Sequence, residues 1–556
     1  KGFTVGALMS ANTVYVMFDP QCPHCGHLWQ ASVPLHKKIK FVWIPVSFIN
    51  AKSTPQGAAL MSAANPADLM TAHEASILAG TGGTAASASV TPEIEEAIKA
   101  NTKLFNSLGV DSVPYIVAKN ARTGQVVSNT GALATAALAA PMREALEARG
   151  LTKLNDEVEV PLVRVLARME DLGIGVDRDE LQALADRLVA EVAEEREAIV
   201  AAAGREFNVN STPQLREVLF DELGLTPQKK TKTGYSTDAA TLEKLRGEHP
   251  IIEHLLRYRE VEKLRSTYGE GLLAEVAVDG RIHATFNQTV ARTGRLSSDQ
   301  PNLHNIPVRS EEGRLFRQVF VPAPGYRLCV ADYNQIELRC IAHLSKDPGL
   351  VGAFTAGEDI HAQTAARIFE VEPDKVTTAQ RSTSKMVSYG LAYGMEAYGL
   401  GQRLSIPTGE AQVILDAYFE GFPNVRAYME GAVAEAREKG YTETLLGRRR
   451  QIPELASRVR AVRQAGERQA MNAGIQGLAA DIFKIALVRL DEALEERGGT
   501  SRLILQVHDE VVLEVPPADE VEMSEVVLDA MSGAFDLAVP LEVNLAFGDT
   551  WAGAKS

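Results

Sequence analysis

The sequence predicts a multidomain protein of mixed α/β and α+β class. Its 556 residues exceed what one hydrophobic core organises, which indicates about three or four structural units. Strands alternate with helices in residues 1–150. Further along, Arg178–Ala203 is a long run of strong helix formers, whereas Leu328–Val330 and Leu503–Leu505 are β-rich and apolar.

The N-terminal 150 residues show a strand and helix pattern with a dithiol at its first turn. The expected elements in order are strand Thr13–Phe18, a helix from the turn Cys22–Cys25, strand Phe41–Phe48, helix-rich Pro55–Leu108, strand Ser112–Val117, a hairpin around Thr123–Gly124 and a helix ending near Arg149–Gly150. Cys22 would lie at a helix N-terminus, where the helix dipole favours a reactive thiolate.

This N-terminal region resembles the DsbA/DsbC/DsbG group of thioredoxin-fold disulfide oxidoreductases, with a helical insertion. The resemblance rests on the Cys22-Pro23-His24-Cys25 turn and on Pro114 before a strand. It implies redox roles for Cys22, Cys25 and Pro114. A zinc half-site is the rival interpretation, but no second Cys/His pair has matching spacing.

The rest of the chain is predominantly helical around a few strands. Arg178–Ala203 is predicted as one helix, and Ser211 is a predicted N-cap before Pro213. A basic tip at Lys229–Thr237 precedes a predicted helix from about Asp238 to Tyr268. The remaining expected elements are a mostly helical region from Arg339 to about Pro453 and an acidic-faced helix near Ala518–Ala534.

Two carboxylates follow the β-rich runs. Asp332 comes after Leu328–Val330, and Asp509 comes after Leu503–Leu505. We expect the two strands to lie side by side and to hold both carboxylates over a shared pair of magnesium ions, as in-line phosphoryl transfer requires.

Four side chains recur at four-residue steps between these carboxylates: Arg381, Lys385, Tyr389 and Tyr393. Each step advances a helix by about 40° beyond a full turn, so the four would form one slowly winding stripe. The cations suit a triphosphate, and the aromatic rings suit a sugar and a base. Taken alone, the stripe also fits a solvated basic turn followed by core aromatics; the two carboxylate motifs favour the first interpretation.

Together these motifs resemble the family A DNA polymerases, the bacterial DNA polymerase I type, from roughly Glu157 to Trp551. The matching segments are Asp332–Arg339, Arg381–Gly394, Val507–Glu510, Thr293–Ser298, Pro301–Leu303, Asn305–Pro307, Asp359–His361, Leu446–Arg449, Gln476–Gly477 and Ala479–Ile482. The resemblance implies a right-hand fold behind the thioredoxin-like domain (1–150) and a linker (151–160). Its expected parts are palm 161–177, thumb about 178–275, palm 276–338, fingers about 339–453 and palm 454–556.

The resemblance also implies site roles. Asp332 and Asp509 would bind two Mg²⁺ ions, with Glu510 as a third catalytic carboxylate or only a neighbour. Lys385 would protonate the leaving pyrophosphate. The expected nucleotide-binding residues are Arg381, Lys385, Tyr389, Tyr393, His361, Gln335 and Glu337. Glu337 matches the residue that blocks a ribose 2′-hydroxyl, although an exposed carboxylate is its alternative. His361 could instead be a packed or helix-capping histidine.

A second set of residues is expected to contact DNA: Arg295, Arg468, Asn472, Gln476, His508, Lys229 and Lys230. His304 departs from the usual glutamine of the family, which puts that contact in doubt. Ser388 and Tyr389 stand where many members have Asn-Phe.

The implied function is a DNA-templated DNA polymerase that adds dNTPs to a primer 3′-hydroxyl by two-metal phosphoryl transfer. Residues 1–150 lack the Asp-x-Glu start of a 3′–5′ exonuclease, so we expect no proofreading. Thiol–disulfide exchange by the N-terminal domain is the alternative main or second activity. We expect primer–template DNA and dNTPs as partners, no membrane, a monomer and a cytoplasmic location.

Charge and cysteine content complicate this picture. The chain carries a net charge of −15, of which residues 1–150 contribute +2, so the remainder is −17. A phosphate-binding protein this acidic must segregate its charges. The basic clusters that allow this are Lys229–Lys232, Arg448–Arg450 and Arg458–Arg468, each of which is alternatively a solvated loop. Cys329 and Cys340 are expected to be reduced core thiols, whereas Cys22 and Cys25 suggest an oxidising compartment. The join between the two parts of the chain could therefore be natural or artificial.

Overall fold

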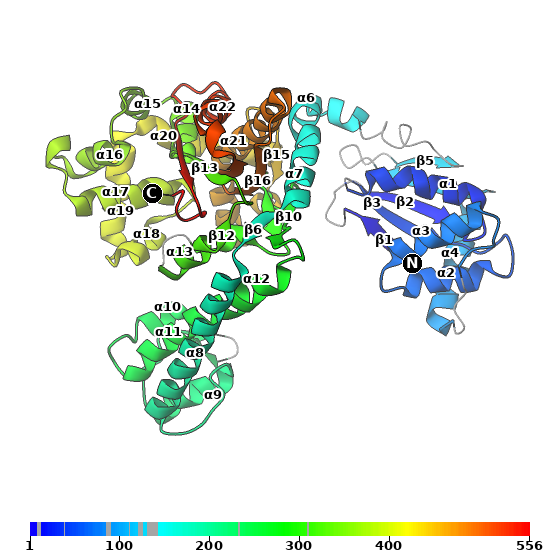
Figure 1. Cartoon of the computed structure of the whole chain (residues 1–556), viewed down its shortest axis with the longest axis horizontal. Helices are drawn as coiled ribbons and strands as arrows, with labels where there is room; N and C mark the ends of the chain where they lie inside the picture. The colour runs from blue at the N-terminus through cyan, green and yellow to red at the C-terminus, as the bar shows by residue number, and fades with distance from the viewer. Residues whose placement is uncertain are drawn as a thin grey trace. The chain divides into compact units, whose positions relative to one another are not determined.

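The computed structural model divides the chain into two compact units, Lys1–Asp156 and Glu157–Ser556 (Figure 1). It describes residues 1–7, 13–37, 39–84, 90–110, 112–119, 126–130, 143–231, 234–307 and 311–555. Within these ranges, no helix has both the length and the apolar character needed to cross a bilayer.

The N-terminal unit is built on a five-stranded sheet in the order β1-β3-β2-β4-β5. Its strands are β1 Phe3–Gly6, β2 Thr13–Phe18, β3 Lys40–Pro45, β4 Tyr115–Lys119 and β5 Val126–Thr130. β2 and β3 run parallel, and the other pairs are antiparallel. The parallel pair is joined through helix α1, Pro23–Ser32. Phe18, Trp29 and Trp43 pack edge to face in the core, with ring centroids 5.2–5.4 Å apart.

Three further helices fill the expected helical insertion: α2 Ser53–Ser62, α3 Pro66–Leu78 and α4 Pro92–Ser107. The prediction that β3 reaches Phe48 is wrong. The strand ends at Pro45 because the amides of Phe48 and Ile49 donate to the Asp19 carboxylate, at 2.8 and 3.0 Å, instead of to a neighbouring strand. β1 was not predicted, and the hairpin tip at 123–124 lies outside the described residues.

The expected linker 151–160 is helical instead of irregular. It comprises α6 Thr152–Leu154, the π-helical turn Asn155–Glu159 and the start of α7, Val160–Leu172. Val158, Leu162 and Val165 are buried at helical spacing, which explains why the segment forms a helix. The boundary between the units therefore lies at 156/157, inside this segment.

The second unit has a central antiparallel sheet in the order β16-β17-β13-β18. The strands are β13 Arg327–Tyr333, β16 Arg502–Val507, β17 Glu510–Val515 and β18 Val543–Gly548. The prediction that the strands before Asp332 and Asp509 are neighbours is wrong, because β17 lies between β16 and β13. Asp509 belongs to the tight turn from β16 to β17, and this turn brings it back toward the end of β13.

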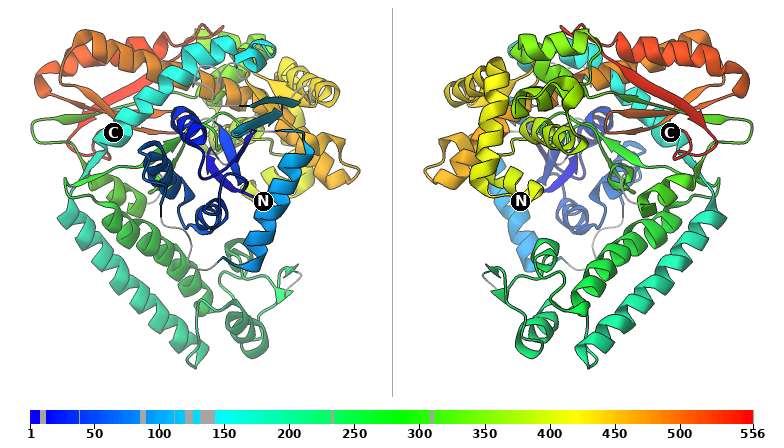
Figure 2. Two further views of the ribbon diagram at one scale, coloured as in Figure 1. Left: turned by 90° about the vertical axis from the view of Figure 1, so that its right-hand side faces the viewer. Right: turned by 90° about the vertical axis from the view of Figure 1, so that its left-hand side faces the viewer.

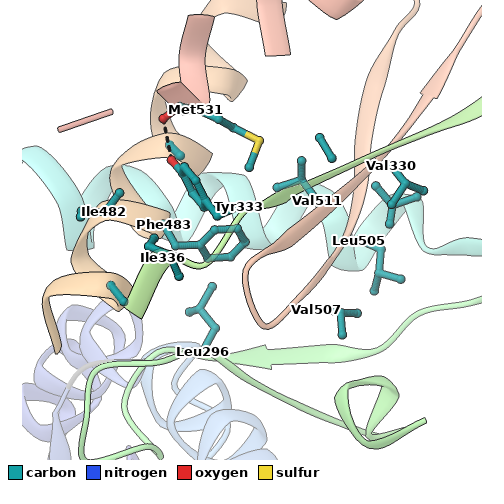
Figure 3. Packing of buried hydrophobic residues seen from close by; sticks show 14 of the residues in the cluster. Leu296, Val330, Tyr333, Ile336, Ile482, Phe483, Leu505, Val507, Val511 and Met531 are labelled. Carbon is teal, nitrogen blue, oxygen red and sulfur yellow. Dashed lines mark hydrogen bonds between the residues drawn. The ribbon is translucent and has the colours of Figure 1, made fainter. Parts of the chain in front are cut away.

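Helix α22 Glu520–Ser532 packs on β13 and β18 of this sheet, and α21 Arg460–Arg497 packs against both α22 and α14 Ile336–Ser345. Figure 3 shows the junction, where Phe483 and Ile482 of α21 meet Tyr333, and the Tyr333 hydroxyl donates to the Met531 carbonyl at 2.7 Å. Cys329 and Cys340 are buried free thiols here, as expected. A smaller sheet has the order β12-β6-β9, with β6 Ile174–Val176, β9 Arg281–Ile282 and β12 Phe320–Val321.

Two long helices lie side by side and project from the unit (Figure 2). They are α8 Arg178–Ala203, as predicted, and α11 Pro250–Leu264. The predicted continuous helix 238–268 is wrong: α10 Ala239–Glu243 stops before Gly247, whose φ of +82° ends a helix, and Pro250 opens the next. Ser211 precedes α9 Thr212–Arg216 as expected, but its side chain makes no capping hydrogen bond.

The helical region after Arg339 consists of α15 Pro348–Thr355, α16 Ile360–Phe369, α17 Thr378–Ala392, α18 Ala397–Leu404, α19 Thr408–Gly421 and α20 Pro423–Lys439. The remaining elements include α12 Glu270–Glu275, α13 Glu311–Gln318, and the strand pairs β7 Lys230–Thr231 with β8 Gly234–Tyr235, β10 Thr285–Asn287 with β11 Ser297–Asp299, and β14 Tyr441–Glu443 with β15 Arg449–Gln451. The β7–β8 pair forms the basic tip.

Candidate active site

A cleft of about 470 Å³ opens where the central sheet meets α17 and α21. Its lining includes most residues that the sequence singled out: Arg295, Asp332, Gln335, Glu337, His361, Arg381, Lys385, Tyr389, Tyr393, His508 and Asp509. Thus β13, α14, α16, α17 and the β16–β17 turn contribute to one site. The structure brings together segments more than 200 residues apart in the chain.

Asp332 and Asp509 form the acidic end of this cleft. Burial raises the pKa of Asp332, and burial together with the Glu337 and Asp332 charges raises the pKa of Asp509 to about 7. Both shifts express the cost of holding carboxylates together away from water. A bound divalent cation would relieve that cost, so this donor set fits magnesium.

Helix α17 supplies the cationic end. It begins with a capping box, in which Thr377 and Gln380 satisfy each other's backbone amides. Arg381, Lys385 and Tyr389 follow on one face, and Tyr393 is the C-cap. All four line the cleft, which confirms the predicted stripe. Tyr393 is 50% exposed, so the alternative of a core aromatic is wrong for this residue.

Glu337 is held in place from two sides. It is buried, forms a close ion pair with Arg295, and accepts a hydrogen bond from the Tyr393 hydroxyl at 3.1 Å. The alternative of an exposed carboxylate is therefore wrong.

His361 lies at the start of α16 and is buried, and its ring centroid is 5.8 Å from that of Tyr389. Burial and the nearby Lys385 charge lower its pKa to about 4. Its ring is therefore neutral near pH 7, and Nε2 lies 3.5 Å from the side-chain nitrogen of Gln335.

Glu510 does not belong to the cleft lining. Its side chain is buried, accepts a hydrogen bond from Trp551 Nε1 at 2.5 Å and pairs closely with Lys555. In β-sheet register it stands opposite Asp332 and adds negative charge there. The bonds to Trp551 and Lys555 favour the alternative of a charged neighbour, and a role as third carboxylate stays a prediction.

The expected DNA contacts are spread more widely. Arg295 and His508 line the cleft, whereas Arg468, Asn472 and Gln476 lie along α21 beyond its lining. Arg468 pairs with Glu396 at 3.2 Å.

The basic tip lies elsewhere in the same unit. Lys229 pairs with Asp238 at 3.2 Å, Lys230 is exposed in β7, and Lys232 falls outside the described residues.

Two buried polar groups were misjudged or missed. Arg448, expected in a phosphate-binding cluster, is instead paired with Asp481 at 2.6 Å and with Glu159. Lys484 lines the cleft, is 1% exposed and pairs with Glu159 at 2.8 Å. A single lysine inside an otherwise apolar helical run was the available signal for it.

His304, which departs from the family pattern, packs against the β16–β17 region that carries His508. Its Nε2 lies 3.0 Å from the Gln506 carbonyl oxygen, and its ring centroid is 5.4 Å from that of His508. Burial lowers its pKa to about 4. His304 therefore packs, as a neutral ring, against His508 of the cleft lining.

In the N-terminal unit, Cys22 is the N-cap of α1, as predicted. Hydrogen bonding from Cys25 lowers the pKa of Cys22 to about 7, while burial raises the pKa of Cys25 well above its usual value. Cys22 Sγ lies 3.5 Å from the Val113 carbonyl oxygen, and the Val113–Pro114 peptide is cis.

Among the described residues, no group of three or more His, Cys, Asp or Glu side chains is arranged to hold a metal ion.

Comparison with known protein families identifies the family to which the second unit is similar. The model of "DNA polymerase family A" matches residues 178–553. The chain belongs to this family. It is 50% identical over 406 residues to DNA polymerase I of Mycobacterium tuberculosis, which is 72% of this chain and 45% of that protein. Against the thermostable DNA polymerase I of Thermus thermophilus, identity is 49% over 405 residues, 72% of this chain and 48% of the relative.

A solved structure agrees with this membership. The POL domain of Pol1 from M. smegmatis, in complex with DNA primer-template and dNTP, has a TM-score of 0.73 and 47% identity, covering 76% of this chain and 75% of that one. The chain spans slightly less than half the length of the curated relatives above.

Proposed function

We propose that this chain is a DNA-templated DNA polymerase that extends a primer 3′-hydroxyl with deoxynucleotides. The observation that carries the proposal is one cleft that joins a carboxylate pair to a cationic helix face. This charge separation matches a metal-bound triphosphate, whose phosphates meet cations and whose metals meet carboxylates. Family membership and the primer-template and dNTP in the related complex support the same conclusion.

In the proposed reaction, Asp332 and Asp509 would hold two Mg²⁺ ions, and bound metal would supply activation of the primer hydroxyl and stabilisation of the leaving group. The 3′-oxygen forms a bond to the α-phosphorus while the bond to pyrophosphate breaks. Arg381 and His361 bind the triphosphate, and Lys385 neutralises it and gives a proton to the departing pyrophosphate.

Glu337 acts as the sugar filter in this proposal. Its carboxylate, fixed by Arg295 and Tyr393, would occupy the space and the hydrogen-bonding position that a ribose 2′-hydroxyl needs. Tyr389 and Tyr393 face the sugar and base, and Gln335 lies beside His361. A fixed, buried carboxylate discriminates better than a mobile one, because it cannot move aside for the wrong sugar.

We assign the palm to 161–177, 276–338 and 454–556, the thumb to about 178–275 and the fingers to about 339–453. The central sheet, the projecting α8–α11 pair and the helices α14–α20 support these three assignments in turn. Lys229 and Lys230 at the thumb tip would hold duplex backbone, and Arg295, Arg468, Asn472, Gln476 and His508 would contact the primer end. A monomer would suffice, since one chain supplies every proposed site residue.

Primer extension with magnesium and all four dNTPs tests the proposal. Asp332→Ala and Asp509→Ala should each abolish extension while primer–template binding persists, because DNA-backbone contacts come from other residues. Asp416→Ala, an exposed carboxylate of α19, is the matched control and should extend normally. Extension by either cleft variant at a tenth of the parent rate or more would overturn the assignment.

We propose a second activity, thiol–disulfide exchange, for the N-terminal unit as a thioredoxin-like domain. The favouring observation is the asymmetric dithiol at the start of α1, in which the pKa of Cys22 is lowered and the pKa of Cys25 is raised. Cys22 would attack a substrate disulfide, and Cys25 would then displace the reduced substrate and close the Cys22–Cys25 disulfide. Cys22→Ser should abolish reduction of insulin by the dithiothreitol-reduced chain while primer extension continues. Unchanged insulin reduction by this variant would refute the second activity.

A further inference from the structure

Asp359 contacts two of the groups that face the proposed triphosphate site. It is the N-cap of α16, and its Oδ1 accepts the backbone N–H groups of His361 at 2.9 Å and Ala362 at 3.1 Å. Its Oδ2 accepts from Arg381 Nε of α17 at 2.7 Å. One carboxylate thus links the start of the helix that carries His361 to the cationic stripe.

The way in which Arg381 is held matters. A guanidinium has five N–H donors in a rigid plane, so a bond at Nε fixes the plane and leaves the two terminal nitrogens for other ligands. In the part of the chain that the structure describes, Arg381 has no ion pair besides Asp359. The terminal nitrogens are therefore free to bind phosphate oxygens in the cleft.

Arg381 lies between two cavities. It lines both the main cleft and a second cavity of about 270 Å³, which Asp359, Glu358 and Glu542 also line. Arg339 also lines this cavity and is paired with Glu542 at 2.6 Å, which leaves Glu358 without an ion pair among the described residues. An unrestrained guanidinium would be attracted toward Glu358 and away from the triphosphate. The bond to Asp359 fixes Arg381 at the boundary between the two.

We propose that Asp359 is a positioning residue that holds Arg381 toward the incoming triphosphate, and this inference rests on the proposed polymerase function. Asp359 itself does not line the main cleft, so it acts through Arg381 and, as the helix cap, through His361. Loss of the carboxylate lets the guanidinium rotate, which weakens ground-state binding of the nucleotide more than it slows the chemical step.

Steady-state single-nucleotide insertion separates the two links. Asp359→Ser keeps an oxygen that can cap α16 but is too short and uncharged to hold Arg381. We expect Asp359→Ser to raise KM for the nucleotide about five- to tenfold, with kcat changed less than twofold. In an Arg381→Ala background the same change should alter KM less than twofold, because its target is gone. Asp416→Ser, which breaks the exposed Asp416–Arg426 pair at 3.4 Å, is the matched control and should leave KM unchanged.

The comparison of Asp359→Ser with and without Arg381 distinguishes positioning of Arg381 from a general structural role of Asp359. An equal rise in KM from Asp359→Ser with and without Arg381 would show a general structural role and overturn the inference, as would an unchanged KM in the parent background. If Asp359→Ser fails to fold, Asp359→Asn carries the same comparison, because asparagine also caps helices but lacks the charge. Failure of the parent chain to extend primers at all would refute the proposed function instead.

Discussion

Glu74 in α3 makes the stability of the N-terminal unit dependent on pH. Its side chain is 1% exposed, and neither carboxyl oxygen has a hydrogen-bond partner among the residues that the structure describes. It lies against the start of α1, where a Cβ on Gly26 would stand 3.0 Å from Oε2. Burial, with the nearby Cys22 and Asp19 charges, raises the pKa of Glu74 from 4.5 to about 9.

The sign of the effect follows from proton linkage. Between the unfolded pKa near 4.5 and the folded pKa near 9, the folded unit holds one more proton than the unfolded chain. The free energy of unfolding therefore falls as pH rises, by about 1.4 kcal/mol per pH unit at most. Between pH 5 and pH 8 the loss reaches roughly 4 kcal/mol, an upper limit that water entry on local opening reduces.

Glu74→Gln should remove this slope, because the amide has nearly the same shape as the protonated acid and does not titrate. The measurement is amide hydrogen exchange in peptides that cover β2 and β3, corrected for intrinsic rates, from pH 5 to pH 8. The parent unit should lose protection as pH rises, and the variant should lose about 2–4 kcal/mol less. Glu93→Gln, at an exposed position of α4, is the control. Parallel pH profiles for the parent and Glu74→Gln would refute the reasoning.

Three further predictions concern the polymerase unit. Tyr389→Phe removes a hydroxyl that could replace the missing 3′-hydroxyl of a dideoxynucleotide, so it should raise discrimination against dideoxynucleotides at least tenfold, or about 1.4 kcal/mol, in competitive extension; equal incorporation would show that Tyr389 does not face the sugar. A primer with a mismatched 3′ end should stay intact without dNTPs, and ladder-like shortening of that primer would reveal proofreading. Asp481→Ala leaves Arg448 without one of its buried partners and should destabilise the unit by about 3–5 kcal/mol in thermal unfolding, unlike the exposed Asp374→Ala.

Local patterns predicted the cationic part of the site well. Arg381, Lys385, Tyr389 and Tyr393 needed only helical periodicity to fall on one face, and the capping box of Thr377 starts that helix. The dithiol was equally local, since Cys22 at the start of α1 depends on a few adjacent residues. Such features arise within one element, so its sequence is sufficient to place them.

The features that the sequence missed depend on contacts between distant segments. The position of β17 between β16 and β13, which brings the Asp509 turn back to the end of β13, is set by strand pairing across about 180 residues. The Asp359–Arg381 bond and the Glu159–Lys484 pair likewise join separate helical segments. A single sequence shows the charges but not which of them will neutralise each other.

That neutralisation explains how a unit with a net charge near −17 could hold the proposed triphosphate. Four of the described residues that line the cleft are cations, but Arg295 is paired with Glu337 and Lys484 with Glu159. Arg381 keeps its terminal nitrogens available, and Lys385 has no ion pair within the described residues. Among the described cleft residues, the unpaired positive charge is thus confined to one face of α17. Asp332 and Asp509 form no ion pair among these residues, which suits the proposed binding of metal ions. The proposed phosphate binding therefore depends on the pairing pattern inside one cleft, and overall charge is a poor guide to it.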